Sequence, residues 1–248
     1  MLTRRLIPSM LLKQGRLVKG VRFRDHRDAG YPPTTARAHS HQGADELILL
    51  DIDASKTGQE PDFKTVREVA SECSMPVTFG GGVRSIEDAR ACMDAGIDKI
   101  CLTTTALDDP ALITRLAQIF GSQAVVLGVD VADGSCLYDH RSDSTIADPR
   151  PIDWIREGVD RGAGEIRLMA VNREGSRSGM ELDLLVEVLD AVSVPVILEG
   201  GAGTLEHLEE ALHAGADGVA VGTMLVFSDN NLVKVKRHLA GSDCDMRL

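Results

Sequence analysis

The sequence has no stretch that would place the chain in a membrane or send it out of the cell. No apolar run approaches the roughly 18 residues that a membrane-spanning helix needs. The apolar part of its basic and then apolar start is too short for a secretory signal peptide. We therefore expect a cytoplasmic protein without membrane contact, whose first residues form a buried strand.

The sequence also lacks paired cysteines, an excess of basic over acidic residues, and linker segments. The five cysteines are scattered, form no Cys-x-x-Cys pair and lie near no histidine at metal spacing. This pattern predicts reduced thiols, no metal and no cofactor. The net charge of −11 argues against a nucleic-acid partner, because phosphates attract basic surfaces. No Pro-, Ser- or Gly-rich linker divides the 248 residues.

What the sequence does contain is an internal repeat, in which residues 75–107 align with residues 194–226. The offset is 119 (194 − 75). Gly81 and Gly82 thereby meet Gly200 and Gly201. A repeat of half the chain length without a linker favours one closed domain over two separate ones. We predict a single domain over residues 1–248, built from half-repeats of about 1–119 and 120–248.

Short apolar runs alternate with amphipathic segments along the whole chain. Continuous rather than alternating hydrophobicity is typical of parallel strands that are covered on both faces. Helices are expected at 85–95 and 204–214, each opening with a capping Ser or Thr, and two more are expected to start at Asp109-Pro110 and at Pro151. Eight strand–helix units predict a (β/α)₈ TIM barrel, with a doubly wound sheet as the alternative. The expected strands are 6–12, 47–52, 77–79, 99–102, 124–129, 166–170, 196–198 and 218–221.

Glycines and threonines follow the strands at the end of a TIM barrel where chemistry takes place. Glycine-rich turns let backbone N–H groups approach an anion, so two such turns at repeat positions predict two phosphate sites. Tight turns without a ligand are the alternative. The basic segment 15–30 is predicted to be a lid over an anionic ligand, or else a solvated loop. The predicted phosphate-binding residues are Gly82, Thr103, Thr104, Gly201, Gly222 and Thr223.

One acid stands out at this end of the barrel. Asp130 ends an apolar strand, where burial can raise the pKa of a carboxyl group and suit it to general acid or base catalysis. A structural acid is the alternative. The repeat places Leu11 opposite Asp130 (130 − 11 = 119), so a twofold active site would have kept only one of its two acids.

Four charged residues begin the strands at the opposite end. Arg5, Glu46, Lys99 and Glu165 are expected to ring the bottom of the barrel, and Glu46 and Glu165 are repeat mates. Taken alone, such a ring is typical of salt bridges that stabilise the fold.

These features resemble one family over essentially the whole chain, the cyclase subunits of imidazole glycerol phosphate synthase in histidine biosynthesis. The resemblance implies a bis-phosphorylated ribulosyl substrate at the barrel mouth, held also by Lys19, Glu174 and Gly175. It further implies a glutaminase partner, which faces Asp98 and sends ammonia through the charged ring. The motifs that carry it are LVKG (17–20), DELILLDIDAS (45–55), FGGGV (79–83), FGSQAVV (120–126), RGAGEI (161–166) and EGGAG (199–203).

Several mouth residues depart from the family pattern. Leu11 replaces an acid, Met169 a threonine, Glu199 a serine and Thr103 an asparagine. The motifs IPSMLLK (7–13) and LDIDASKTGQEPDF (50–63) resemble a branch that serves amidation of surface-sugar precursors, with a sugar amidotransferase as a further partner. We predict this paralogue, with an orthodox histidine-pathway cyclase and a non-catalytic ammonia conduit as the alternatives.

Overall fold

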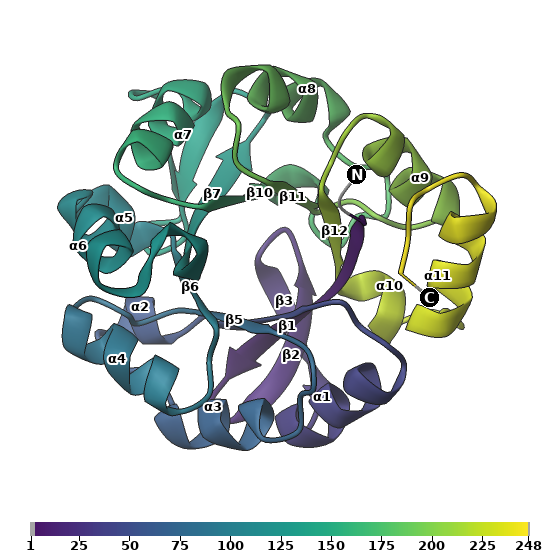
Figure 1. Ribbon diagram of the computed structural model, residues 1–248, viewed down its shortest axis with the longest axis horizontal. Helices are drawn as coiled ribbons and strands as arrows, with labels where there is room; N and C mark the ends of the chain where they lie inside the picture. The colour runs from purple at the N-terminus through teal and green to yellow at the C-terminus, as the bar shows by residue number, and fades with distance from the viewer. Residues whose placement is uncertain (1–2, 248) are drawn as a thin grey trace.

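Eight parallel strands close into a barrel that is surrounded by helices (Figure 1). The computed structural model describes residues 3–247. Pairing of the sixth barrel strand with the fifth closes the ring and rules out the open, doubly wound alternative. The barrel strands are β1 (Arg5–Lys13), β4 (Leu47–Asp51), β5 (Val77–Gly80), β6 (Lys99–Leu102), β7 (Val125–Ala132), β10 (Glu165–Ala170), β11 (Val196–Glu199) and β12 (Gly218–Val221).

The predicted (β/α)₈ barrel is thus confirmed, and every predicted strand overlaps a barrel strand. β6 and β12 agree with the prediction to the residue. β1 and β7 run further toward the barrel mouth than expected, because each continues into an antiparallel hairpin. These extensions were not predicted, because both hairpins lack alternating hydrophobicity.

The helices form a single outer layer around the barrel. None of the helices within residues 3–247 is long and apolar enough to cross a membrane. The longer helices are α1 (Pro32–His41), α3 (Phe63–Ala70), α4 (Ile86–Asp94), α6 (Ala111–Phe120), α7 (Pro151–Asp160), α8 (Leu182–Ala191), α9 (Leu205–His213) and α11 (Leu232–Gly241). Short helical turns are α2 (Ala54–Thr57), α5 (Thr104–Asp108), α10 (Thr223–Val226), η1 (Ser122–Ala124) and η2 (Val171–Arg173).

Helices α4 and α9 begin as the sequence predicts. The Ser85 hydroxyl accepts a hydrogen bond from the Asp88 amide at 3.0 Å, and the Asp88 carboxylate accepts one from the Ser85 amide at 3.0 Å. This reciprocal capping box satisfies amides that the first helical turn leaves without partners. Thr204 caps α9 by accepting from the His207 amide. The repeat therefore extends to the way its helices start.

Two antiparallel hairpins stand beside the barrel mouth. They are β2 (Arg16–Val21) with β3 (Arg24–Gly30), and β8 (Cys136–Asp139) with β9 (Ser144–Ile146). Their tips touch, because the Phe23 and Tyr138 rings meet edge to face with centroids 5.8 Å apart. The predicted lid segment is thus a hairpin, and its Arg16 and Arg24 pair with acids outside the cavity.

The barrel interior has its own small apolar layer, separate from the main core between strands and helices. Ile7, Ile48, Ile197 and Ala220 are nearly inaccessible to solvent and pack together inside the ring of strands. Inward and outward residues alternate along each strand, so positions two residues apart share the interior. The layer therefore lies between charged residues at the bottom of the barrel and the mouth.

Helix α6 offers a matched test of the main core. Leu116 is completely buried on it, whereas Ile119 is 46% exposed on the same helix. We expect Leu116→Ala to lower the free energy of unfolding by about 2–5 kcal/mol, because it leaves a cavity in a packed layer. Ile119→Ala should change it by less than about 0.5 kcal/mol. Urea unfolding measures both, and equal losses would contradict the packing described.

Candidate functional site

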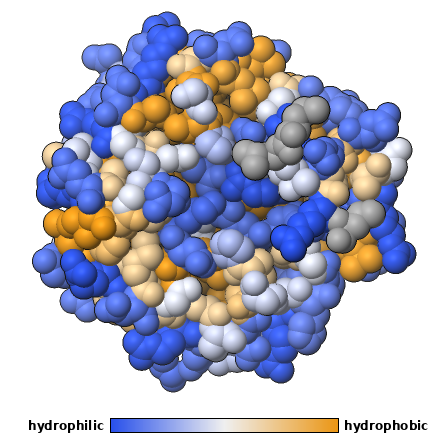
Figure 2. Space-filling view, in the orientation of Figure 1, coloured by the Kyte–Doolittle hydropathy of each residue, from blue (hydrophilic) through white to orange (hydrophobic). Residues whose placement is uncertain are grey.

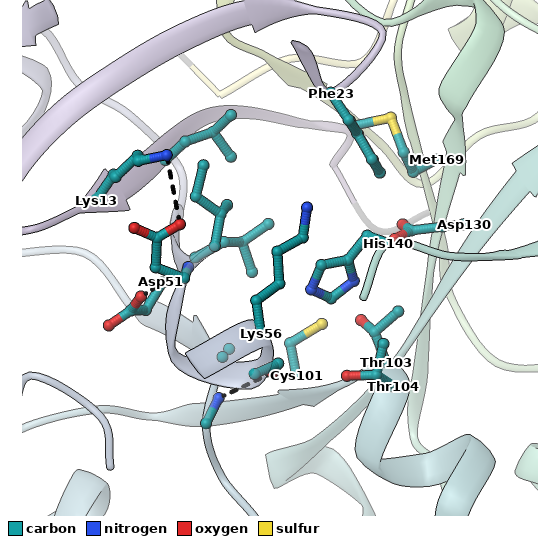
Figure 3. Close-up of a pocket in the computed structure, with 18 of the residues that line it drawn as sticks. Lys13, Phe23, Asp51, Lys56, Cys101, Thr103, Thr104, Asp130, His140 and Met169 are labelled. Atoms are coloured by element: carbon teal, nitrogen blue, oxygen red, sulfur yellow. Dashed lines mark hydrogen bonds and ion pairs between the residues drawn. The ribbon is translucent and has the colours of Figure 1, made fainter. Parts of the chain in front are cut away.

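A cavity of about 220 Å³ opens where the barrel strands end (Figure 3). Its lining comes from strand ends, from the turns after them and from both hairpins, as expected for the functional end of a TIM barrel. The cavity brings together most of the residues predicted for the first phosphate site and for proton transfer. Lining residues predicted from the sequence include Leu11, Lys19, Gly82, Thr103, Thr104, Asp130, Met169 and Glu174.

Asp130 is the buried acid of this cavity. It lies on β7 and is 7% exposed, and burial raises the pKa of its carboxyl group to about 6 against the opposing pull of Arg167. A pKa near the working pH suits a group that gives or takes a proton. Leu11 lines the same cavity from β1 and carries no titratable group. The position opposite Asp130 in the repeat is therefore apolar in the structure as well.

Arg167 is a site residue that our sequence analysis missed. It is 3% exposed, and its Nε donates to Glu199 Oε2 at 2.6 Å while Nη1 lies 3.4 Å from Asp130 Oδ1. Burial alone would raise the pKa of Glu199, but Arg167 and Lys19 hold it below its ordinary value. The available signal was an arginine within the apolar strand IRLMA.

The first predicted phosphate site is open to the cavity. Gly81 and Gly82 follow β5 with positive φ angles of 105° and 76°. A side chain at Gly81 would collide with the carbonyl oxygen of Asp51, so only glycine allows the turn to pass this close. Thr103 and Thr104 follow the neighbouring strand β6 and face the same space. This corner can receive an anion on backbone amides and hydroxyls.

The second predicted phosphate site is narrower. A pocket of about 20 Å³ is lined by the predicted residues Gly175, Gly201, Gly222 and Thr223. The Thr223 hydroxyl is buried without a hydrogen-bond partner among the described residues. This leaves Thr223 a polar group that a bound phosphate could satisfy.

The ammonium of Lys19 is already placed at this second pocket. Lys19 Nζ lies 2.6 Å from Glu174 Oε1, and both side chains are at least 95% buried. A methyl group at Gly222 would come within 2.8 Å of the same Nζ. Lys19 therefore stands between the two predicted phosphate sites, balanced by one carboxylate.

Two further mouth residues were missed because the hairpins and short turns that carry them were not predicted. His140, beside β8, and Lys56, from α2, point into the cavity in Figure 3. Burial, followed by the nearby Lys56 charge, lowers the pKa of His140 to about 4. The imidazole is therefore neutral near pH 7 and lies close to a primary amine.

At the other end of the barrel the four predicted charges form one ion-pair ring. Lys99 Nζ lies 2.9 Å from Glu46 Oε2 and 2.8 Å from Glu165 Oε2. Arg5 contacts the same two carboxylates at 3.0 and 2.5 Å. Thr78 donates to Glu46 at 2.6 Å. The structure thus brings all four predicted residues together and closes the bottom of the barrel with alternating charges.

The surface around this ring includes Asp98. Asp98 is exposed and its carboxylate accepts a hydrogen bond from the Val77 amide at 2.8 Å, as its repeat mate Asp217 does from Val196 at 2.9 Å. The start of β1 lies toward the viewer in Figure 1, and Figure 2 shows hydrophilic residues gathered at the centre of this face. Asp98 therefore has a structural role at the bottom face, where it is also accessible.

Metal ligands are not assembled at either end. Within residues 3–247 no group of three or more His, Cys, Asp or Glu side chains is placed to hold a metal ion. Burial raises the pKa of Cys101, beside the cavity, to about 11, so this thiol is protonated near neutral pH.

Comparison with known proteins agrees with the geometry. A family model described as "Histidine biosynthesis protein" matches residues 5–231. A protein of Halalkalibacterium halodurans is 42% identical, with 96% of this chain and 97% of that protein covered. Proteins of Lysinibacillus sphaericus and Maricaulis maris are 40% and 42% identical, with both chains covered completely. Each of the three is named "Imidazole glycerol phosphate synthase subunit HisF".

These relatives favour one of the alternatives predicted from the sequence over the main prediction. Their names agree with the orthodox histidine-pathway alternative and give no support to the predicted surface-sugar branch or to a sugar amidotransferase partner. The motifs at 7–13 and 50–63 are therefore better taken as variation within the cyclase subunits. Leu11 still departs from the family pattern, because it stands where that pattern has an acid.

The ion-pair ring allows a direct test of its strength. Lys99→Met should lower the free energy of unfolding by about 3–5 kcal/mol, because it leaves Glu46 and Glu165 as buried carboxylates with one cation fewer. Arg115→Met is the control, since its pair with Asp109 is more than 40% exposed on both sides and should matter by less than about 1 kcal/mol. Urea unfolding of both variants gives the comparison. A loss for Lys99→Met no larger than the control would show that the ring is not cohesive.

Proposed function

Since this chain belongs to the family of histidine biosynthesis proteins, we propose that it is an ammonia-using cyclase subunit of an imidazole glycerol phosphate synthase. One observation carries the proposal. The same barrel has an ion-pair ring at its bottom, and at its mouth it has the buried Asp130 beside two predicted phosphate sites. Such a barrel can admit a small molecule from below and use it above. The cyclase is an enzyme subunit that works with a second protein.

The bottom of the barrel suits a glutaminase partner that supplies ammonia. We propose that the glutaminase docks on the face around the ring formed by Arg5, Glu46, Lys99 and Glu165, with accessible Asp98 at the contact. Ammonia is neutral and small, whereas the ring is held by ion pairs to two buried carboxylates, where charge interactions are strong. Rearrangement of one pair would open the bottom for ammonia and keep other solutes out.

The mouth suits a substrate with a phosphate at each end. We propose that one phosphate binds at Gly82, Thr103 and Thr104, and the other at Gly175, Gly201, Gly222 and Thr223. The open first corner and the unpartnered Thr223 hydroxyl support this assignment. Lys19 would contact a phosphate while it keeps its pair with Glu174, because an ammonium has three N–H donors and its Nζ already lies beside Gly222.

Asp130 is the group that we assign to proton transfer. When ammonia becomes part of a ring, the nitrogen must lose protons and the departing oxygen must gain them. A buried carboxyl with a pKa of about 6 can do either near neutral pH. Its side chain lies at the floor of the cavity, between the apolar layer through which ammonia would arrive and the substrate space above.

Leu11 favours a second candidate function. A barrel that has lost one of two acids can pass ammonia to another enzyme without closing a ring itself. The two candidates make opposite predictions for purified protein, because only a cyclase consumes the bis-phosphorylated ribulosyl substrate when ammonium salt replaces the glutaminase.

The assay therefore compares the chain with Asp130→Asn and Leu11→Asp. We expect turnover by the unchanged chain, and a loss of about 10²–10⁴-fold for Asp130→Asn, which removes the proton-transfer group. Leu11→Asp should raise the rate, because it places a second carboxyl in the same cavity. Leu11→Asn should not raise it, because asparagine has the size of aspartate but no acid group. Product formation is followed by absorbance or mass spectrometry.

The outcomes separate the candidates. No turnover by the unchanged chain together with turnover by Leu11→Asp would favour the conduit and show that the substrate sites remain intact. Unchanged turnover in Asp130→Asn would remove Asp130 from the mechanism.

A further inference from the structure

Arg167 occupies an unusual place, because a guanidinium stands inside the barrel between the ring and the mouth. It points inward, since Glu165, two residues earlier on β10, belongs to the ion-pair ring. Its register partners on the neighbouring strands are Gly128 on β7 and Ile197 on β11. Gly128 has no side chain, and Thr103 Oγ1 and Cys101 Sγ occupy the interior on that side, where a methyl group at Gly128 would come within 3.0 Å of both.

The next inward row toward the mouth supplies its partners. Met169 pairs in register with Asp130 on β7 and with Glu199 on β11. Arg167 therefore faces one carboxylate on each neighbouring strand. The contact with Glu199 is short, at 2.6 Å, and the contact with Asp130 is longer, at 3.4 Å. The guanidinium is thus held firmly on one side and touches Asp130 weakly on the other.

We infer that Arg167 is a positioning residue for Asp130, and that Arg167 and Glu199 together set how readily this carboxyl exchanges a proton. The inference rests on the proposed function in one respect, namely that Asp130 transfers the proton. Because the site has Leu11 where a second acid would stand, the charges that tune Asp130 come from β10 and β11. Glu199 keeps the guanidinium from binding Asp130 tightly.

The charged and titratable groups around this cluster come from several elements, and they include His140, which the Arg167 charge affects, and Tyr138 on β8, which Asp130 affects. Arg167 and Glu199 act on Asp130 directly, as does the more distant Asp139 on β8. Lys19 from β2 acts on Glu199, and the buried thiol of Cys101 on β6 lies beside Arg167. Of these groups, Arg167 and Glu199 have the largest effects on the carboxyl, and they act in opposite directions.

The test is to titrate Asp130 itself in protein labelled with carboxyl-¹³C aspartate, using Asp130→Asn to assign its NMR signal. Arg167→Met removes the cation, so the pKa of Asp130 should rise from about 6 to about 7 or above. Glu199→Gln removes the competing anion, so the pKa should fall to about 5 or below. At pH 7 the first variant therefore protonates Asp130 more and the second less. The limb of the cyclase pH–rate profile that Asp130 controls should move in the same directions.

Opposite movements separate positioning from a merely structural role. If Arg167 only stabilised the fold, Arg167→Met would lower the unfolding free energy and leave the Asp130 titration in place. Shifts in the same direction in both variants, or none, would overturn the inference. Because Arg167→Met leaves two carboxylates buried, the double variant Arg167→Met with Glu199→Gln restores the original net charge of the cluster, and its Asp130 pKa should also lie above the starting value.

The control is an arginine–glutamate contact outside the cluster. Arg173→Met breaks a comparable arginine–glutamate contact, 2.7 Å from Arg173 to Glu181, just beyond β10 and should leave the Asp130 titration unchanged. The NMR titration needs no turnover. Opposite shifts in a chain without cyclase activity would therefore retain the inference and reject the proposed function. Cyclase activity without opposite shifts would support the proposed function and overturn the inference about Arg167.

Discussion

The structure depends on the hydrogen bonds between β7 and β10, because they complete the circle of parallel strands. Once the sheet is closed, every second residue of each strand must point at one common axis. Inward side chains from distant parts of the chain then stack in rows, a charged ring at the bottom, an apolar layer above it and the acid cluster below the mouth. The proposed passage of ammonia from the bottom and the proposed chemistry at the mouth both depend on this stacking.

The internal repeat gives the two halves similar frames and different chemistry. Glu46 and Glu165 take equivalent places in the ring, and Asp98 and Asp217 each cap a neighbouring strand. At the mouth the symmetry fails, because Leu11 is apolar where Asp130 is acidic. With an apolar residue at one of the two repeat positions, Asp130 is the only carboxyl of the pair, and its pKa depends on the charges that the second half supplies.

Buried charge is costly unless it is paired, and the barrel interior pairs it twice. The lower ring balances two cations with two carboxylates, and the upper cluster shares Arg167 between two more. Between the two groups lie buried isoleucines and an alanine, whose side chains carry no charge. A neutral molecule is the species best suited to cross that layer, which agrees with ammonia and disfavours ammonium.

The sequence by itself determined the barrel, the glycine turns at its mouth and the members of the lower ring. Those features follow from local patterns, namely apolar runs, capped helices, glycine turns and a repeat that carries each position onto its mate. Only the tertiary structure placed His140 and Lys56 in the mouth and Arg167 between Asp130 and Glu199. The reason is physical: these contacts join neighbouring strands and hairpins that are far apart in the chain, and sequence spacing does not encode register across a closed sheet.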